Sequence, residues 1–210
     1  MNQILQLLCA LALVQLVRSH GFMVSPAARN CMWRYGWGTP KNYDDNQLWC
    51  GGAWKMAALG GKCGVCGDTA DQTNQPHADG GRFAKGIIVK KYRAGQVIDV
   101  DINLSTAHYG YFEFRIGQFD NRKVVGDRYG KLQGHLLPLV SGGTRFKVPD
   151  NIRGARYNIK LRLPSGLRCR RCVLQWWYKG GNNWGCENGK CGMGKGVQEH
   201  FVNCADVSVQ

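Results

Sequence analysis

The sequence predicts an all-β protein, an antiparallel β-sandwich with long loops and short helical turns. Several short segments alternate apolar and polar residues with a period of two, clusters of Gly, Pro and Asn separate them, and no long amphipathic helix is evident. The predicted strands are residues 96–104, 111–116, 156–163, 172–178 and 201–209. Such a sandwich is a rigid platform that presents functional residues on the loops at its ends.

The start of the chain has the features of a signal peptide. Residues 4–17 form an apolar run broken only by Gln6 and Gln15, and small residues stand at the positions that signal peptidase inspects before position 20. We therefore divide the chain into a signal at residues 1–19 and a single domain at residues 20–210. Cleavage there would make the protein secreted and extracellular. No later stretch approaches about 20 consecutive apolar residues, so no membrane association is expected.

Residues 20–86 are rich in Gly, Asn, Asp and aromatic residues and show no sustained period. We expect a long loop region there, held by disulfides, with a short helical turn at residues 53–59 that ends at Gly60 and Gly61.

Nine of the ten cysteines lie after position 19, so at least one is free, paired between molecules or modified. Two Cys-x-x-Cys pairs, residues 63–66 and 169–172, have the spacing of zinc knuckles. In an exported chain the same residues are expected to form disulfides instead. The spacing does not determine which cysteines pair.

The chain is basic, with 28 Lys and Arg residues against 14 Asp and Glu residues and a net charge of +14. A basic surface suits nucleic acids, acidic glycans or anionic cell surfaces. The basic residues are dispersed and form none of the motifs of nucleic-acid-binding modules. We expect no nucleic-acid partner and a largely solvated basic surface.

Two histidines are candidate metal ligands. Cleavage after Ser19 would give His20 a free α-amine, and that amine and the ring Nδ1 could chelate one metal ion. Nitrogen ligands in a planar arrangement favour Cu(II). His108 follows the 96–104 strand on a loop and could supply a further nitrogen. Either residue could instead be an ordinary histidine, His20 if cleavage falls one or two residues away. His77 and His135 are assigned to the surface.

Three features stand in order along the chain. They are the signal ending before His20, Ala107-His108 followed by Gly110-Tyr111-Phe112-Glu113-Phe114, and the terminal Gln198-Glu199-His200-Phe201-Val202-Asn203-Cys204-Ala205-Asp206-Val207. Further motifs are residues 32–36, 50–52, 63–68, 172–176 and 181–185. Together and in this order they resemble the lytic polysaccharide monooxygenases, and within them auxiliary activity family fifteen. The resemblance covers essentially all of residues 20–210.

The resemblance implies a distorted immunoglobulin- or fibronectin-III-like sandwich with one copper ion, cycling between Cu(II) and Cu(I), on a flat face. The amine and Nδ1 of His20 and the Nε2 of His108 would form a T-shaped histidine brace. Phe201 would shield the axial position, Glu199 would orient an oxygen species, and Ala107 would shape the axial access.

These implications predict a secreted, copper-dependent enzyme that oxidatively cleaves β-1,4-linked polysaccharides. No pair of carboxylates of the kind that hydrolysis requires stands out in the sequence. The enzyme would use O₂ or hydrogen peroxide with a small-molecule or protein electron donor, and act as a monomer. Phe201 and the basic surface favour crystalline chitin over cellulose as the substrate.

Trp33, Tyr35 and Trp37 alternate in a Gly-rich loop and are predicted to contact sugar rings, although Trp33 could pack under the loop. Trp176, Trp177 and Trp184 are assigned to core or structural roles. Two alternatives remain. The chain could be a non-catalytic chitin- or glycan-binding module, or a secreted copper-binding protein that uses the same brace.

Overall fold

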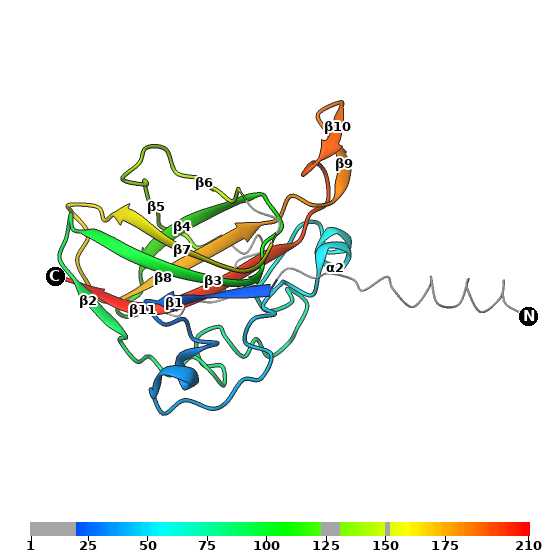
Figure 1. Ribbon diagram of the computed structural model, residues 1–210. Helices are drawn as coiled ribbons and strands as arrows, with labels where there is room; N and C mark the ends of the chain where they lie inside the picture. The colour runs from blue at the N-terminus through cyan, green and yellow to red at the C-terminus, as the bar shows by residue number, and fades with distance from the viewer. Residues whose placement is uncertain (1–19, 123–130, 150–151) are drawn as a thin grey trace, which may run out of the picture.

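The computed structural model describes residues 20–122, 131–149 and 152–210, which form two β-sheets packed into a sandwich (Figure 1). The smaller sheet has the antiparallel order β1-β3-β7, with strands β1 (His20–Ser25), β3 (Val97–Thr106) and β7 (Arg153–Arg162). The larger sheet has the order β2-β11-β8-β4-β5, with β6 beside β4. Its strands are β2 (Lys90–Tyr92), β4 (Tyr111–Gln118), β5 (His135–Leu136), β6 (Phe146–Lys147), β8 (Cys169–Lys179) and β11 (His200–Val209).

The predicted antiparallel sandwich is confirmed, and all five predicted segments coincide with strands β3, β4, β7, β8 and β11. The helical turn is also confirmed as helix α2 (Ala53–Ala58), after which Gly60 and Gly61 take positive φ. Residues 20–25, expected to be loop, instead form β1 along β3. The predicted signal at residues 1–19 lies outside the described residues. Within the described ranges no helix has the length and apolarity needed to span a membrane.

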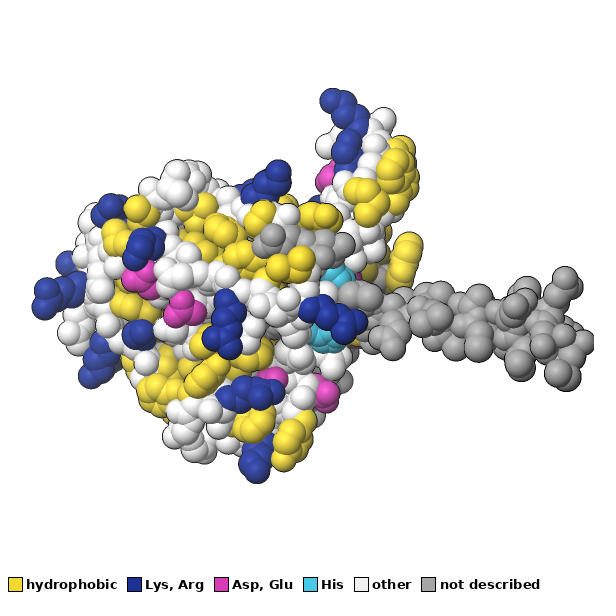
Figure 2. Space-filling model, in the orientation of Figure 1, with side chains coloured by type: hydrophobic (Ala, Val, Ile, Leu, Met, Phe, Trp, Pro, Cys, Tyr) yellow, Lys and Arg dark blue, Asp and Glu magenta, His cyan; other side chains and the backbone are white. Residues whose placement is uncertain are grey.

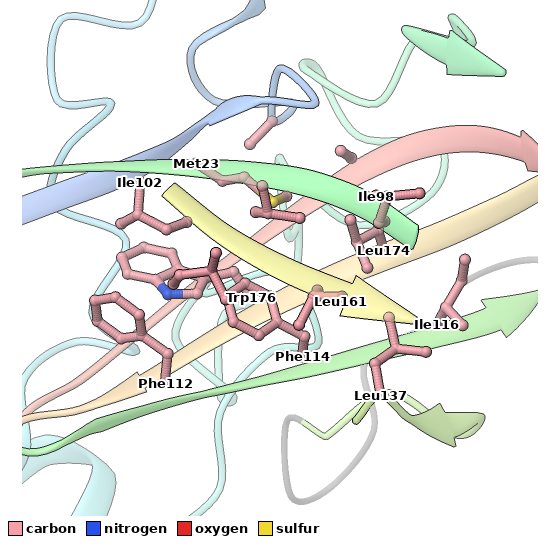
Figure 3. Packing of buried hydrophobic residues seen from close by; sticks show 14 of the residues in the cluster. Met23, Ile98, Ile102, Phe112, Phe114, Ile116, Leu137, Leu161, Leu174 and Trp176 are labelled. Carbon is pink, nitrogen blue, oxygen red and sulfur yellow. The ribbon is translucent and has the colours of Figure 1, made fainter. Parts of the chain in front are cut away.

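The core lies between the two sheets. Alternate residues of β3 point inward and are fully buried, and so are those of β4 and of β8 (Figure 3). Phe112 on β4 packs edge-on against Trp176 and Tyr178 of β8, with ring centroids 5.4 and 4.9 Å apart. Phe112 also packs edge-on against Tyr157 of β7 in the smaller sheet, with ring centroids 5.6 Å apart. Burial of each such side chain stabilises the fold by about 1.5–3 kcal/mol, and this last contact joins the two sheets.

The loop region 26–89 covers the outer face of the larger sheet. Trp177 and Val202 pack there against Met56 of α2 and the Cys50–Cys63 disulfide. β8 and β11 are therefore buried on both faces. This explains why they read as nearly continuous apolar runs rather than as strict alternation.

A buried arginine ties this loop region to β11. The Arg29 guanidinium, 1% exposed, donates to both carboxylate oxygens of Asp206 at 2.7 Å, to Asp79 at 2.8 Å and to the His77 carbonyl at 2.8 Å. Burial alone would lower the pKa of Arg29, but Asp206 and Asp79 hold that pKa above its ordinary value. The ion pairs are thus fully formed inside the protein.

His77 is part of the same buried region, so its assignment to the surface was wrong. It is 4% exposed, its Nδ1 lies 2.7 Å from an Asp68 carboxylate oxygen, and its ring stacks on Phe83. The folded loop supplies the acidic partner that sequence spacing did not indicate. His135 is exposed, as expected.

The cysteines form disulfides, as expected for an exported chain. The pairs are Cys50–Cys63, Cys66–Cys204, Cys169–Cys172 and Cys186–Cys191. Cys31 is the cysteine without a disulfide among the described residues, and burial raises the pKa of its thiol to about 12. The four disulfides and Cys31 account for the nine cysteines after position 19, so no zinc knuckle is needed to explain the odd number.

The buried ion pairs lead to a stability prediction. Arg29→Met should lower the free energy of unfolding by about 3–5 kcal/mol, because it leaves Asp206 and Asp79 buried without their cation. Urea unfolding followed by tryptophan fluorescence measures this change. Arg168→Met, which alters an exposed arginine, should change stability by no more than about 0.5 kcal/mol. A loss below about 1 kcal/mol for Arg29→Met would contradict the structural role given to this cluster.

Candidate copper site

The pairing of β1 with β3 brings His20 and His108 to the same end of the smaller sheet. His20 is paired with Thr106, and the Ser105 hydroxyl donates to the His20 carbonyl at 3.1 Å. His108 follows Thr106 by two residues. Gly21 allows the close approach, since a Cβ there would overlap the Leu104 side chain and lie 2.7 Å from the Asn103 carbonyl oxygen. The two predicted metal ligands are therefore brought together.

The backbone of His108 is held on both sides. Its N–H donates to the Tyr178 hydroxyl at 2.8 Å, and that hydroxyl donates to the Tyr109 carbonyl at 2.8 Å. The His108 carbonyl accepts from the Gly181 N–H at 2.7 Å. Gly110 makes this tight turn possible, because a Cβ at its position would collide with the Lys179 carbonyl. The loop that carries His108 is thus fixed to β8.

The His108 side chain is 2% exposed, and two polar side chains lie at its Nδ1. The Asn182 side-chain nitrogen is 2.8 Å away, and the Glu199 Oε2 is 3.7 Å away. The ring nitrogen that remains for an external ligand is Nε2. Glu199 therefore does lie beside a predicted ligand, whereas Asn182 was missed, and its only sequence signal was its place in the 181–185 motif.

Phe201 and Ala107 belong to the core next to the histidines. Phe201 is 1% exposed and stacks on Tyr178 with ring centroids 5.9 Å apart. Ala107 is fully buried, and its N–H donates to the Ile152 carbonyl at 2.7 Å. Neither side chain carries an atom that binds metal.

His200 lies between Glu199 and Phe201 but faces the other side of the sheet. Its Nδ1 accepts a hydrogen bond from the Trp177 indole at 2.9 Å. Burial, together with the charges of Lys179 and Lys131, lowers the pKa of His200 to about 3. His200 is therefore a neutral structural residue of the layer between β11 and the loop region.

The donor set fits copper better than a closed structural metal site. Within the described ranges, no three histidine, cysteine, aspartate or glutamate side chains converge on a possible metal position. Two imidazoles at one end of the smaller sheet instead offer nitrogen donors of the kind that suits Cu(II).

The predicted aromatic contact residues do not lie beside the histidines. Tyr35 and Trp37 are 45% and 37% exposed, and the half-buried Trp33 donates its indole N–H to Asp45 at 3.0 Å. They follow one another in and after the short helix η1 (Met32–Tyr35). In Figure 1 this blue helical turn lies at the bottom of the view, away from the end of β1 where His20 begins the strand.

Two other tryptophans are more exposed than Tyr35 and Trp37. Trp184, 70% exposed, follows Asn182 by two residues and begins β9 (Trp184–Glu187), which pairs with β10 (Lys190–Met193) as a projecting arm (Figure 1). Trp54, 78% exposed, is on α2. Of the core or structural roles assigned to these tryptophans, the core role is wrong for Trp184, because the arm carries it away from the sandwich, whereas Trp176 and Trp177 are buried.

The arm has its own structural support. Trp184 pairs across the arm with Met193, which is 58% exposed, and the Cys186–Cys191 disulfide joins its two strands. Figure 2 shows apolar side chains gathered on this arm and histidine side chains at the surface on the same end of the molecule. This end therefore combines the exposed Trp184 of the arm with histidine side chains at the surface.

Comparison with known proteins gives a consistent result. A family model described as "Lytic polysaccharide mono-oxygenase, cellulose-degrading" matches residues 20–207. An AA15 lytic polysaccharide monooxygenase from Thermobia domestica, solved in the Cu(I) state, is 41% identical, with a TM-score of 0.83 over 90% of this chain and 98% of that one. No curated protein matches the chain.

A chitin binding domain from Burkholderia pseudomallei shares the fold alone, at 14% identity and a TM-score of 0.50 over 92% of this chain and 100% of that one. The family model matches residues 20–207, and the structural match to the Thermobia enzyme covers 90% of this chain. The chain therefore belongs to the lytic polysaccharide monooxygenase family and is a copper-dependent polysaccharide monooxygenase with one copper ion as its cofactor.

Proposed function

We propose that His20 and His108 hold the copper ion once residues 1–19 have been removed. The ligand atoms are the α-amine and Nδ1 of His20 and the Nε2 of His108. The observation that carries this proposal is the pairing of His20 with Thr106, which puts both histidines at one end of the sheet. The family match, which begins at His20, supports the same starting residue. Copper held there supplies the one-electron redox chemistry by which O₂ or hydrogen peroxide oxidises a C–H bond beside a glycosidic bond.

The neighbouring side chains have separate roles in this proposal. Phe201 would shield the copper position with a ring that cannot coordinate, and the small side chain of Ala107 would shape the access to it. Glu199 orients the oxygen co-substrate. Its Oε2 is buried and has no hydrogen-bond partner among the described residues, so it is available to accept a hydrogen bond from a co-substrate that bears a proton.

We propose crystalline chitin as the substrate, with cellulose as the alternative outcome of the test. A polymer surface cannot enter a deep cleft, and the exposed rings of Trp184 and Trp54 suit stacking against sugar rings. Tyr35 and Trp37 provide further exposed rings for a long chain. Trp33, which packs against the Arg34 guanidinium, supports that loop. The +14 net charge and the non-coordinating Phe201 favour chitin within this proposal.

The compartment and the partners follow from the same features. We propose that the protein is secreted, since it has an apolar N-terminal run and four disulfides that need an oxidising environment. It acts as a monomer and receives electrons from a small-molecule or protein donor.

A one-residue extension tests the copper ligands. Adding Ala before His20 converts the α-amine into an amide, so Cu(II) affinity should fall roughly 100-fold or more, beyond the 10–100-fold typical of losing an outer-shell partner. Calorimetric titration measures the affinity, and mass spectrometry of products after ascorbate addition measures activity. His135→Ala, which changes an exposed histidine, should match the unextended protein. Unchanged affinity in the extended protein would rule out the terminal amine as a ligand.

The substrate surface has its own test. Trp184→Ala and Trp54→Ala should each weaken binding to β-chitin about 5–30-fold, the usual effect of truncating a contact tryptophan at the centre of an interface. Tyr43→Ala, which changes a tyrosine that is 75% exposed beside Trp33, serves as the control and should bind normally. Binding isotherms on chitin and cellulose, with the oxidised products of each, decide the substrate. Oxidised products from cellulose alone would disprove the choice of chitin.

A further inference from the structure

Two buried oxygen atoms near His108 lack hydrogen-bond partners. They are Asn182 Oδ1 and Glu199 Oε2, and neither has a partner among the described residues. Both belong to the side chains that face the imidazole Nδ1. A buried polar atom without a partner costs about 1–3 kcal/mol. Of these two side chains, only Asn182 ends in both an oxygen and a nitrogen, so the orientation of its amide decides which atom faces Nδ1.

The Asn182 amide has two orientations of nearly the same shape, because its oxygen and its NH₂ group differ little in size. With the nitrogen toward His108, Nδ1 must accept, and the ring proton is then on Nε2. With the oxygen toward His108, Oδ1 takes a position 2.8 Å from Nδ1 and accepts the Nδ1–H bond. The second orientation gives Oδ1 a donor and leaves the Nε2 lone pair free, which metal binding through Nε2 requires.

We propose that Asn182 is the positioning residue for the copper ligand His108, through an Nδ1–H···Oδ1 hydrogen bond that keeps the ring proton on Nδ1 and leaves the Nε2 lone pair for the metal. This inference rests on the proposed ligand set. The Glu199 carboxylate, 3.7 Å from the same nitrogen, favours the same tautomer because its negative charge attracts the N–H bond.

The bond would complete the restraint of His108. Tyr178 and Gly181 fix its backbone, and that leaves rotation of the ring about the side-chain torsions. A hydrogen bond at Nδ1 restricts this rotation and sets the direction of Nε2. Partners of this kind are common behind metal-bound histidines and orient the ring as well as select its tautomer.

Nuclear magnetic resonance of the metal-free, ¹⁵N-labelled protein that begins at His20 tests the tautomer directly. We expect the two-bond ¹H–¹⁵N correlations of His108 to show a protonated Nδ1 and an unprotonated Nε2. A proton on Nε2 in the wild-type protein would overturn the proposal. This measurement needs no variant and no enzymatic activity.

Two variants at position 182 separate the hydrogen bond from packing. Asn182→Leu keeps a similar volume but has no acceptor, so it should populate the Nε2–H tautomer and lower Cu(II) affinity about 10–100-fold. Asn182→Asp keeps an acceptor oxygen and should retain the Nδ1–H tautomer and an affinity within a few-fold of wild type. An Asp variant that behaves like the Leu variant, or a Leu variant that behaves like wild type, would refute the role.

The neighbouring asparagine provides the matched control. Asn183 is also half-buried, but its side-chain nitrogen donates to the Val197 carbonyl at 3.3 Å. Asn183→Leu should leave the His108 tautomer and the copper affinity unchanged, and an equal loss there would contradict the proposal. Addition of Cu(I), which is diamagnetic, should shift the Nε2 resonance of His108. If it does not, the ligand set itself is wrong, and this failure is distinct from failure at Asn182.

Discussion

The pairing of the first strand with β3 is the constraint on which the site depends. A ligand at the start of a strand is useful only if that strand cannot fray, because chain ends are otherwise poorly ordered. β1 is held by its antiparallel pairing with β3. In addition, the Gly21 N–H donates a hydrogen bond to the Asn46 carbonyl at 3.0 Å, and the Met23 N–H donates one to the Asn203 side-chain oxygen on β11 at 3.0 Å. The buried Arg29 then fixes the chain that follows to Asp206 of β11. Because these contacts join β1 to strands of both sheets, both sheets together fix the position of His20.

The loop region contributes more than a connection between strands. It buries the outer face of β8 and β11 and is joined to β11 by the Cys66–Cys204 disulfide. Because that face is covered, Trp177 and His200 belong to an interior layer, while Phe201, the next residue, faces the sandwich core. Because successive side chains of a strand point to opposite faces, His200 and Phe201 lie on different sides of the sheet. His200 has a structural role, and Phe201 faces the side of the proposed copper position.

Tyr178 connects the hydrophobic core to the backbone of His108. Its ring packs between Phe112 and Phe201, and its hydroxyl accepts from the His108 N–H and donates to the Tyr109 carbonyl. The same turn is closed by Gly181, which precedes Asn182 and the arm that carries Trp184. One short stretch after β8 therefore supports the histidine backbone, contacts its ring and carries an exposed aromatic group.

The sequence by itself determined the sandwich, the five long strands, the use of cysteines as disulfides and the family, because period-two alternation and ordered motifs are local patterns. It also indicated His20 and His108 as metal ligands, a prediction that the β1–β3 register supports by pairing His20 with Thr106, two residues before His108. Only the tertiary structure decided that His77 is buried on Asp68, that Trp184 is exposed on an arm and that Asn182 contacts His108. Those facts depend on which distant loops pack together, and residue spacing along the chain carries no information about such contacts.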